Sequence, residues 1–315
     1  MTTPAAGGPT AGTGRRPFGE RLAAAMDAHG PLCVGIDPHP ELLAAWGLPD
    51  DATGARELAR RVMAAVGGRV AAVKPQVAFF ERHGSAGVAV LEELVTLGRE
   101  AGTLVVMDAK RGDIGSTMAA YADAYLRDGA PLAADALTVS PFLGFGSLAP
   151  AVEAAQATGR GLFVLALTSN PEGPDVQHAR RADGASVAGS IAAAAGRLNA
   201  AELGGLGPVG LGSIGLGPVG LESVGLGSVG LVVGATTGDA VARLGIDLEA
   251  VRGPLLAPGV GAQGAGATEL TAVFGRARRA VLAASSRGVL AAGPDVADLR
   301  AAAARAAGEA TAALR

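Results

Sequence analysis

Short apolar runs recur along the chain, and each ends at a charged residue, a hydroxyl residue or a proline. Eight runs follow this pattern, and Ala-rich segments with helical periodicity separate them. Uninterrupted apolar runs of this length are typical of strands that are buried on both faces of a parallel sheet. The predicted strands are Leu32–Ile36, Val70–Val73, Thr103–Met107, Asp135–Val139, Leu162–Leu167, Leu231–Ala235, Leu255–Ala257 and Ala280–Ala284.

The alternation of strands and helices predicts the fold class. Repeated strand–helix–strand units with right-handed crossovers build a parallel sheet, and eight such units close it into a (β/α)8 TIM barrel. We therefore predict one barrel domain over residues 17–315. An open doubly wound sheet is the alternative, but no G-x-G-x-x-G follows the first strand. Polar residues also follow many strands instead of gathering at one switch point, which favours the barrel.

Two segments do not fit the barrel pattern. Residues 1–16 are rich in Gly, Pro and Thr, and we expect a disordered tail there. Residues 206–230 repeat the unit Leu-[Gly/Glu]-[Pro/Ser]-[Val/Ile]-Gly, which contains too much Gly and Pro for a helix or a strand. We predict a low-complexity insertion at about 204–230, in a helix-to-strand connection opposite the active face. A tolerated repeat expansion explains it best, and an elastic partner-binding module is the alternative.

Composition and charge exclude several classes of protein. The net charge is −3 without a long run of either sign, so there is no electrostatic footprint for nucleic acid or an anionic membrane. No uninterrupted apolar stretch could span a bilayer, and we expect a cytoplasmic protein. Cys33 is the only cysteine, which predicts a buried, inert thiol. The four histidines lack a metal-binding spacing, so we expect no metal site.

Three charged residues stand where the third predicted strand ends. Asp108 and Lys110 should point the same way because side chains alternate along a strand, whereas Asp113 lies beyond the strand in a turn. Two carboxylates and an ammonium so close together would hold one another ionised and leave Lys110 a positioned proton donor. A solvated salt bridge at a strand end is the alternative.

The motif around these residues resembles a known signature. Residues 108–117 are Asp-Ala-Lys-Arg-Gly-Asp-Ile-Gly-Ser-Thr. This resembles the signature of orotidine 5'-phosphate decarboxylases, in their longer bacterial subfamily. The resemblance extends over about Phe18–Ala292 without the repeats. It departs at Ala265, where many relatives have glycine, and at Thr237-Gly238, near which many have proline.

The resemblance implies an activity and its catalytic residues. The activity is conversion of orotidine 5'-monophosphate to UMP without a cofactor or metal. Lys110 would stabilise and protonate the carbanion, within an ion network that includes Lys74, Asp108 and Asp113. From the sequence alone, Lys74 could equally be a Schiff-base lysine, a phosphate ligand or a strand-end charge. The family places Asp113 in the neighbouring subunit's site, which implies a homodimer with shared active sites.

The resemblance also implies a set of substrate-binding residues at other strand ends. A glycine-rich loop after the seventh strand and an arginine after the eighth would hold the phosphate. The alternative reading of these positions is a plain turn, a helix cap or a solvated charge. Two other functions remain open: a Mg²⁺-dependent sugar-phosphate decarboxylase or aldolase of the same superfamily, and a non-catalytic phosphate-binding barrel. The implied substrate-binding residues are Asp37 for the ribose, Ser169 for the pyrimidine, Gln263 and Arg287 for the phosphate, and also Thr117 and Pro258.

Overall fold

Eight parallel strands close into a barrel in the computed structural model, which describes residues 14–205, 225–260 and 265–315. Each strand pairs with its neighbours in sequence, and β1 pairs with β8 to complete the ring. The predicted TIM barrel is thereby confirmed. Residues 206–224, most of the predicted insertion, lie outside the described residues, as do Gln263 and residues 1–13. The strands are β1 (Leu32–Ile36), β2 (Ala72–Pro75), β3 (Leu104–Arg111), β4 (Ala136–Val139), β5 (Gly161–Leu167), β6 (Val229–Val233), β7 (Leu255–Pro258) and β8 (Val281–Ser285).

Three strands differ from their predicted bounds by two residues or more. β2 begins two residues later than predicted and includes Lys74, and β3 continues past Met107 to Arg111. β6 begins at Val229, two residues before the predicted start. Its start is fixed by Asn199, whose side chain bonds both the N–H and the C=O of Val229 at 3.0 and 2.8 Å. Such long-range contacts are not visible in a local hydrophobic pattern.

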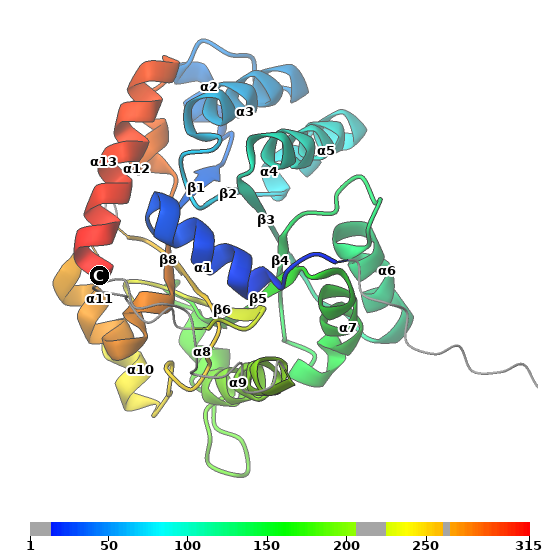
Figure 1. The fold of residues 1–315 in the computed structure, drawn as a ribbon, viewed down its shortest axis with the longest axis vertical. Helices are drawn as coiled ribbons and strands as arrows, with labels where there is room; N and C mark the ends of the chain where they lie inside the picture. Colours follow the sequence, from blue (N-terminus) through cyan, green and yellow to red (C-terminus); the bar gives the residue numbers. More distant parts are fainter. Residues whose placement is uncertain (1–13, 206–224, 261–264) are drawn as a thin grey trace, which may run out of the picture.

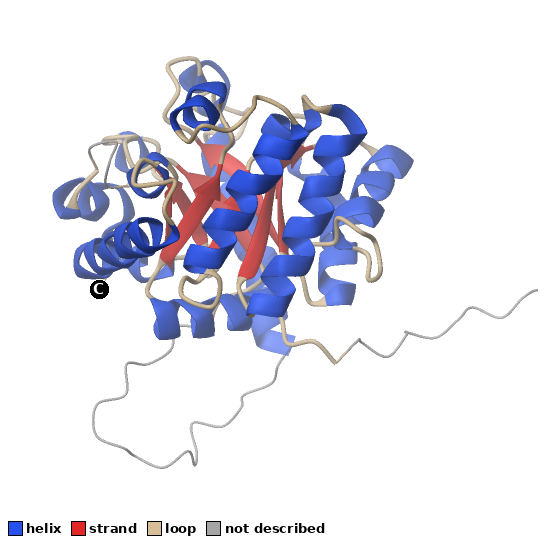
Figure 2. Cartoon of the chain, turned by 90° about the horizontal axis from the view of Figure 1, so that it is seen from above, coloured by secondary structure: helices blue, strands red, loops and turns tan. Residues whose placement is uncertain are grey.

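Helices surround the barrel, as Figures 1 and 2 show. Most of them bury one apolar stripe against the strands, and the main hydrophobic core lies between these two layers. None of the described helices is long and apolar enough to cross a membrane. The helices are α1 (Phe18–His29), α2 (Pro40–Ala45), α3 (Ala52–Val66), α4 (Ala78–Glu81), α5 (Gly84–Ala101), α6 (Gly115–Leu126), α7 (Ala149–Thr158), α8 (Gly173–Gln177), α9 (Val187–Gly205), α10 (Ala240–Arg243), α11 (Ala267–Phe274), α12 (Arg287–Leu290) and α13 (Val296–Leu314).

A second hydrophobic cluster fills the barrel interior. Small strand residues such as Cys33 and Ala72 pack there around Phe163, and α1 adds Phe18 and Leu22. Helix α1 therefore covers one end of the barrel (Figure 1). Burial raises the pKa of the Cys33 thiol to about 12, so the thiol stays protonated at neutral pH. The predicted inert thiol agrees with this environment.

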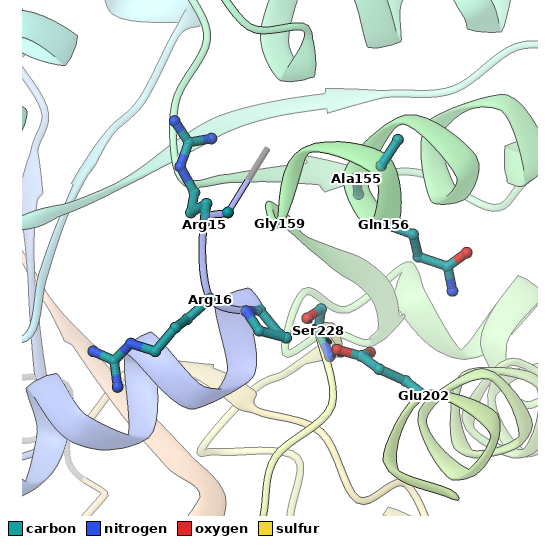
Figure 3. Close-up of a pocket in the computed structure, with 10 residues that line it drawn as sticks. Arg15, Arg16, Ala155, Gln156, Gly159, Glu202 and Ser228 are labelled. Atoms are coloured by element: carbon teal, nitrogen blue, oxygen red, sulfur yellow. Dashed lines mark hydrogen bonds between the residues drawn. The ribbon is translucent and has the colours of Figure 1, made fainter. Parts of the chain in front are cut away.

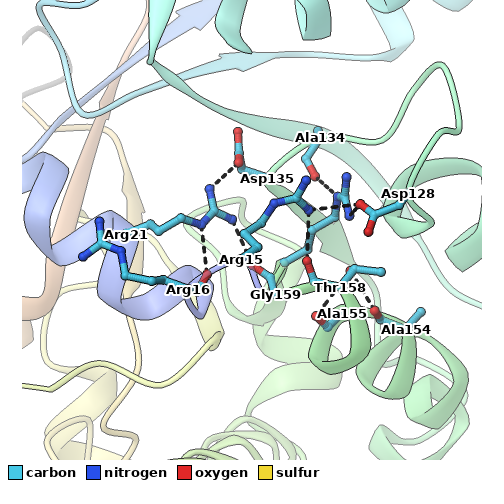
Figure 4. A network of polar contacts seen from close by, with 11 residues as sticks. Arg15, Arg16, Arg21, Asp128, Ala134, Asp135, Ala154, Ala155, Thr158 and Gly159 are labelled. Carbon is cyan, nitrogen blue, oxygen red and sulfur yellow. Dashed lines mark hydrogen bonds and ion pairs between the residues drawn. The ribbon is translucent and has the colours of Figure 1, made fainter. Parts of the chain in front are cut away.

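An ion pair fastens α1 to the amino-terminal ends of the strands (Figure 4). Arg21 pairs with Asp135 at 2.5 Å and donates to the carbonyl of Gly159 at 2.9 Å. Asp135 in turn accepts a hydrogen bond from the N–H of Val105 in β3 at 2.9 Å. Because Arg21 and Asp135 are both partly buried, this pair holds the closed end of the barrel more firmly than an exposed pair would.

A cavity of about 560 Å³ lies at this same end of the molecule, next to Arg15, Gln156 and Glu202 (Figure 3). Its acidic residue is already paired, because Glu202 accepts bonds from the N–H and the hydroxyl of Ser228 at 2.8 and 2.7 Å. Helix α9 ends and β6 begins here. The described residues on either side of 206–224 therefore lie at the amino-terminal face of the barrel.

Candidate active site

Three of the four residues predicted for the charged network, Lys74, Asp108 and Lys110, meet at the ends of β2 and β3, and Asp108 is their centre. Its Oδ2 accepts hydrogen bonds from Lys74 Nζ at 2.7 Å and Gln76 Nε2 at 3.1 Å. Its Oδ1 accepts from Lys110 Nζ at 2.6 Å and Thr138 Oγ1 at 2.9 Å. Four donors therefore occupy both oxygens of one carboxylate, which fixes its orientation.

Burial differs strongly across the network. Lys74 and Asp108 are 6% and 7% exposed, whereas the side chain of Lys110 is 44% exposed and reaches the open end of the barrel. Burial alone would raise the pKa of Asp108, but Lys74 and Lys110 outweigh it and lower the pKa to about 2. Burial alone would lower the pKa of Lys74, but Asp108 and Asp37 raise it above its ordinary value. At neutral pH Asp108 and Lys74 therefore keep the charges that their pairing needs.

The path of the backbone at Lys110 is less regular than predicted. Asp108 and Lys110 do meet on one side of β3, but Lys110 has a φ of 51° and the pairing of β3 with β4 shifts register there. The alternation of side chains along a regular strand therefore predicts correctly that Asp108 and Lys110 are neighbours, but it does not predict the backbone conformation of Lys110.

Asp113 lies beyond the strand, as predicted, and stands apart from the network of its own chain. Its carboxylate accepts a hydrogen bond from the N–H of Ile114 at 2.7 Å. Within the described part of the chain it forms no ion pair with Lys110. Thr117 is exposed in the first turn of α6. The structure of one chain thus does not bring these two residues to Lys110.

The other predicted substrate-binding residues follow the carboxyl ends of strands on the same face. Asp37 follows β1, and its buried Oδ1 has no hydrogen-bond partner within the described residues. Because Gly35 has no side chain, Ser286, which follows β8, can lie close to the backbone of β1. A Cβ at position 35 would lie 1.8 Å from Ser286 Oγ and 3.2 Å from Asp37 Oδ2. The remaining positions are Ser169, exposed after β5, Pro258, the last residue of β7, and Arg287, exposed at the start of α12.

Sequence reasoning missed two members of the network, Gln76 and Thr138. Gln76 stands two residues after Lys74, and Thr138 is the one hydroxyl residue in the apolar run of β4. A further signal was available in the composition. Lys74 and Lys110 are the only lysines of the chain, whose other 24 basic residues are arginines. An ammonium used only at two neighbouring strand ends indicates a role that arginine cannot fill.

The donors around Asp108 do not suit a metal ion. Both of its oxygens are bound to ammonium, amide or hydroxyl groups, and the two nearest cations would repel a divalent ion. Among the described residues, no three His, Cys, Asp or Glu side chains are grouped so that they could hold a metal.

Comparison with known proteins gives a consistent result. A curated orotidine 5'-phosphate decarboxylase of Streptomyces coelicolor is 57% identical over 92% of this chain and 95% of its own length. One from Salinispora arenicola is 58% identical over 94% of this chain and 98% of its own. The solved OMP decarboxylase of Leishmania donovani is 32% identical, with a TM-score of 0.68 over 94% of this chain and 98% of its own.

A crystal structure of a candidate orotidine 5'-phosphate decarboxylase from Streptomyces avermitilis is more similar, with 57% identity and a TM-score of 0.85. It covers 95% of this chain and 96% of its own. The model of the orotidine 5'-phosphate decarboxylase / HUMPS family matches residues 30–302, which include both lysines and the whole network around Asp108. On its sequence, its barrel and its charged site, this chain belongs to the orotidine 5'-phosphate decarboxylase family.

Proposed function

We propose that the chain decarboxylates orotidine 5'-monophosphate to UMP, with Lys110 as the proton donor. The observation that carries this proposal is the pair of lysines held by one buried carboxylate at the mouth of the barrel. Loss of CO2 from C6 of the pyrimidine leaves an electron pair on a carbon that has no conjugated sink. A fixed ammonium beside that carbon stabilises the developing charge without any reorganisation of water.

The proton then follows a short route. The bond between C6 and the carboxylate breaks, CO2 leaves, and the electron pair stays on C6. Lys110 Nζ transfers a proton to C6 and becomes a neutral amine, which water at the open end of the barrel protonates again. Asp108 holds Nζ in place, and Lys74 neutralises Asp108 from the buried side, so the network is charged and ordered before substrate arrives.

Binding energy comes from parts of the substrate that do not react. In this proposal Asp37 contacts the ribose and Ser169 contacts the pyrimidine, while Gln263 and Arg287 hold the phosphate and Pro258 shapes the loop before Gln263. The position of Arg287 supports its role, because it follows β8 on the same face as Lys110. Remote phosphate binding of this kind can lower the barrier at the reacting carbon.

We also propose that the enzyme is a cytoplasmic homodimer in which Asp113 and Thr117 complete the partner's site. Two observations support this arrangement. Asp113 has no bond to Lys110 within the described part of its own chain. Next to it, Ile114 is 62% exposed, and Phe142 and Leu143 of the neighbouring loop after β4 are 76% and 55% exposed. Exposed apolar side chains beside a charged site are typical of a surface that another subunit covers.

A spectrophotometric assay tests the activity directly. Purified enzyme should change the ultraviolet absorbance of orotidine 5'-monophosphate as UMP forms, and it should retain its rate in EDTA. Absence of turnover would contradict the proposed function. A rate that disappears in EDTA and returns with Mg²⁺ would instead favour the metal-dependent branch of the superfamily.

A further inference from the structure

Lys110 has a backbone conformation that residues other than glycine seldom adopt. Its φ is 51°, in the left-handed region. The conformation occurs in a bulge, since Met107 pairs with Leu137 and the next pair joins Arg111 to Val139. Three residues of β3 therefore face the single residue between Leu137 and Val139. The N–H of Lys110 consequently needs a partner outside the regular ladder.

Thr138 is that single residue, and its hydroxyl supplies the missing partner. Thr138 Oγ1 accepts a hydrogen bond from the N–H of Lys110 at 2.9 Å and donates one to Asp108 Oδ1 at 2.9 Å. The same Oδ1 accepts from Lys110 Nζ at 2.6 Å. A hydroxyl has one hydrogen and two lone pairs, so it can form both bonds at once. The result is a closed ring that joins the backbone of Lys110 to its own ammonium.

Among the described residues, these two bonds are the only hydrogen bonds of the Thr138 hydroxyl. Thr138 is 0% exposed, and its strand neighbours Leu137 and Val139 are apolar. Valine has almost the same shape and would suit a buried strand, whereas a buried hydroxyl is costly unless it is hydrogen-bonded. The hydroxyl is therefore tied to the geometry of Lys110 and not to packing.

We propose that Thr138 is a positioning residue for the decarboxylation. It acts through Lys110 and Asp108 by holding the strained backbone of the lysine and the orientation of the carboxylate. The inference rests on the proposed role of Lys110 as proton donor. Without the hydroxyl, the ammonium should still pair with Asp108 but should no longer be held at one place relative to C6.

Kinetics of Thr138→Val test the proposal. We expect kcat to fall roughly tenfold to a hundredfold, the cost typical of a displaced reacting group. Affinity for UMP should stay unchanged, because the phosphate and pyrimidine contacts remain. Thr138→Ser keeps the hydroxyl and should restore kcat to within about threefold of the wild type. A wild-type kcat in Thr138→Val, or a Thr138→Ser variant as slow as Thr138→Val, would overturn the proposal.

Thr103→Val is a matched control at the other end of β3. Thr103 is 3% exposed, and its hydroxyl accepts a hydrogen bond from the N–H of Gly68 at 2.7 Å, far from the site. Its loss should lower the melting temperature and leave kcat unchanged. If Thr138→Val does not fold, Thr138→Ala removes the same hydroxyl without adding a methyl group, and the same kinetic criteria apply.

A spectroscopic readout separates positioning from general destabilisation. Protein labelled with ¹³C at lysine Cε should give two side-chain signals, because the chain has only two lysines. Thr138→Val should shift or broaden the Lys110 signal. The signal should have its wild-type position and width in Thr138→Ser and in Thr103→Val. An unmoved Lys110 signal in Thr138→Val would contradict the inference.

Lys110→Ala distinguishes a failure of this inference from a failure of the proposed function. If Lys110→Ala stays active, the proposed donor is wrong, whereas a wild-type rate in Thr138→Val alone refutes only the role of Thr138.

Discussion

Mixing two inactive variants should restore part of the activity if the active site is shared between subunits. Lys110→Ala removes the proposed proton donor of its own barrel, and Asp113→Ala removes the carboxylate that we propose for the partner's site. Each homodimer should be nearly inactive. In a mixed dimer, one site combines an intact Lys110 from one chain with an intact Asp113 from the other, and the second site lacks both.

The size of the recovery follows from this geometry. Random exchange makes half of the dimers mixed, and each mixed dimer contains one intact site of two, so about a quarter of all sites should recover. Two differently tagged variants can be refolded together, purified through both tags in series and assayed by loss of orotidine 5'-monophosphate. The doubly tagged fraction should then have about half of the wild-type activity per dimer.

A second mixture serves as the control. Lys110 and Asp108 come from the same chain in every site, since their side chains bond directly at 2.6 Å. Lys110→Ala mixed with Asp108→Asn should therefore recover nothing. If verified mixed dimers of Lys110→Ala and Asp113→Ala also stay inactive, Asp113 acts within its own chain or outside the site, and the shared-site proposal is wrong.

Three further predictions concern the phosphate, the ion network and the insertion. Arg287→Ala should raise KM at least about tenfold and also lower kcat, because phosphate binding supports the reaction at C6, and an unchanged KM would remove Arg287 from the site. The pKa of Asp108 is lowered from 3.8 to about 2 on folding. Asp108 should therefore contribute roughly 2 kcal/mol to the free energy of unfolding, in full above about pH 5 and progressively less as the pH falls towards 2. In denaturant unfolding between these pH values, Asp108→Asn should lose less free energy of unfolding than the wild type. Equal losses would show that the acid sensitivity does not come from Asp108. Deletion of residues 206–225 should leave kcat and KM nearly unchanged, because the described residues that flank this segment lie at the amino-terminal face. A folded but inactive deletion variant would place the segment near the substrate.

The barrel could be predicted from the sequence because its signal is local and repeated. Each predicted strand is a short apolar run followed by a charged residue, a hydroxyl residue or a proline, and the runs recur at the spacing of strand–helix units. The same rule placed Lys74 and Asp108 at one face, where their side chains bond at 2.7 Å. A strand end in a parallel barrel fixes the face on which a residue lies, without any knowledge of the other strands.

The details of the site depend on contacts that a local pattern does not contain. Thr138 resembles any β-branched residue of a buried strand until its distance to Asp108 is known. The bulge at Lys110 follows from the pairing of β3 with β4, which the alternation of side chains does not reveal. The start of β6 depends on Asn199, which is 30 residues away in sequence. In the proposed dimer, the place of Asp113 depends on a second chain, which the sequence of one chain does not describe.

The most direct test of the mechanism is the single-turnover rate of Lys110→Ala with excess enzyme over orotidine 5'-monophosphate. Excess enzyme removes product release from the measured rate, so the rate reports the chemical step. We predict a loss of at least about a thousandfold, within the range expected for a positioned proton donor, while UMP binds with nearly wild-type affinity. A Lys110→Ala enzyme that binds UMP normally and decarboxylates within about tenfold of the wild-type rate would show that another group supplies the proton.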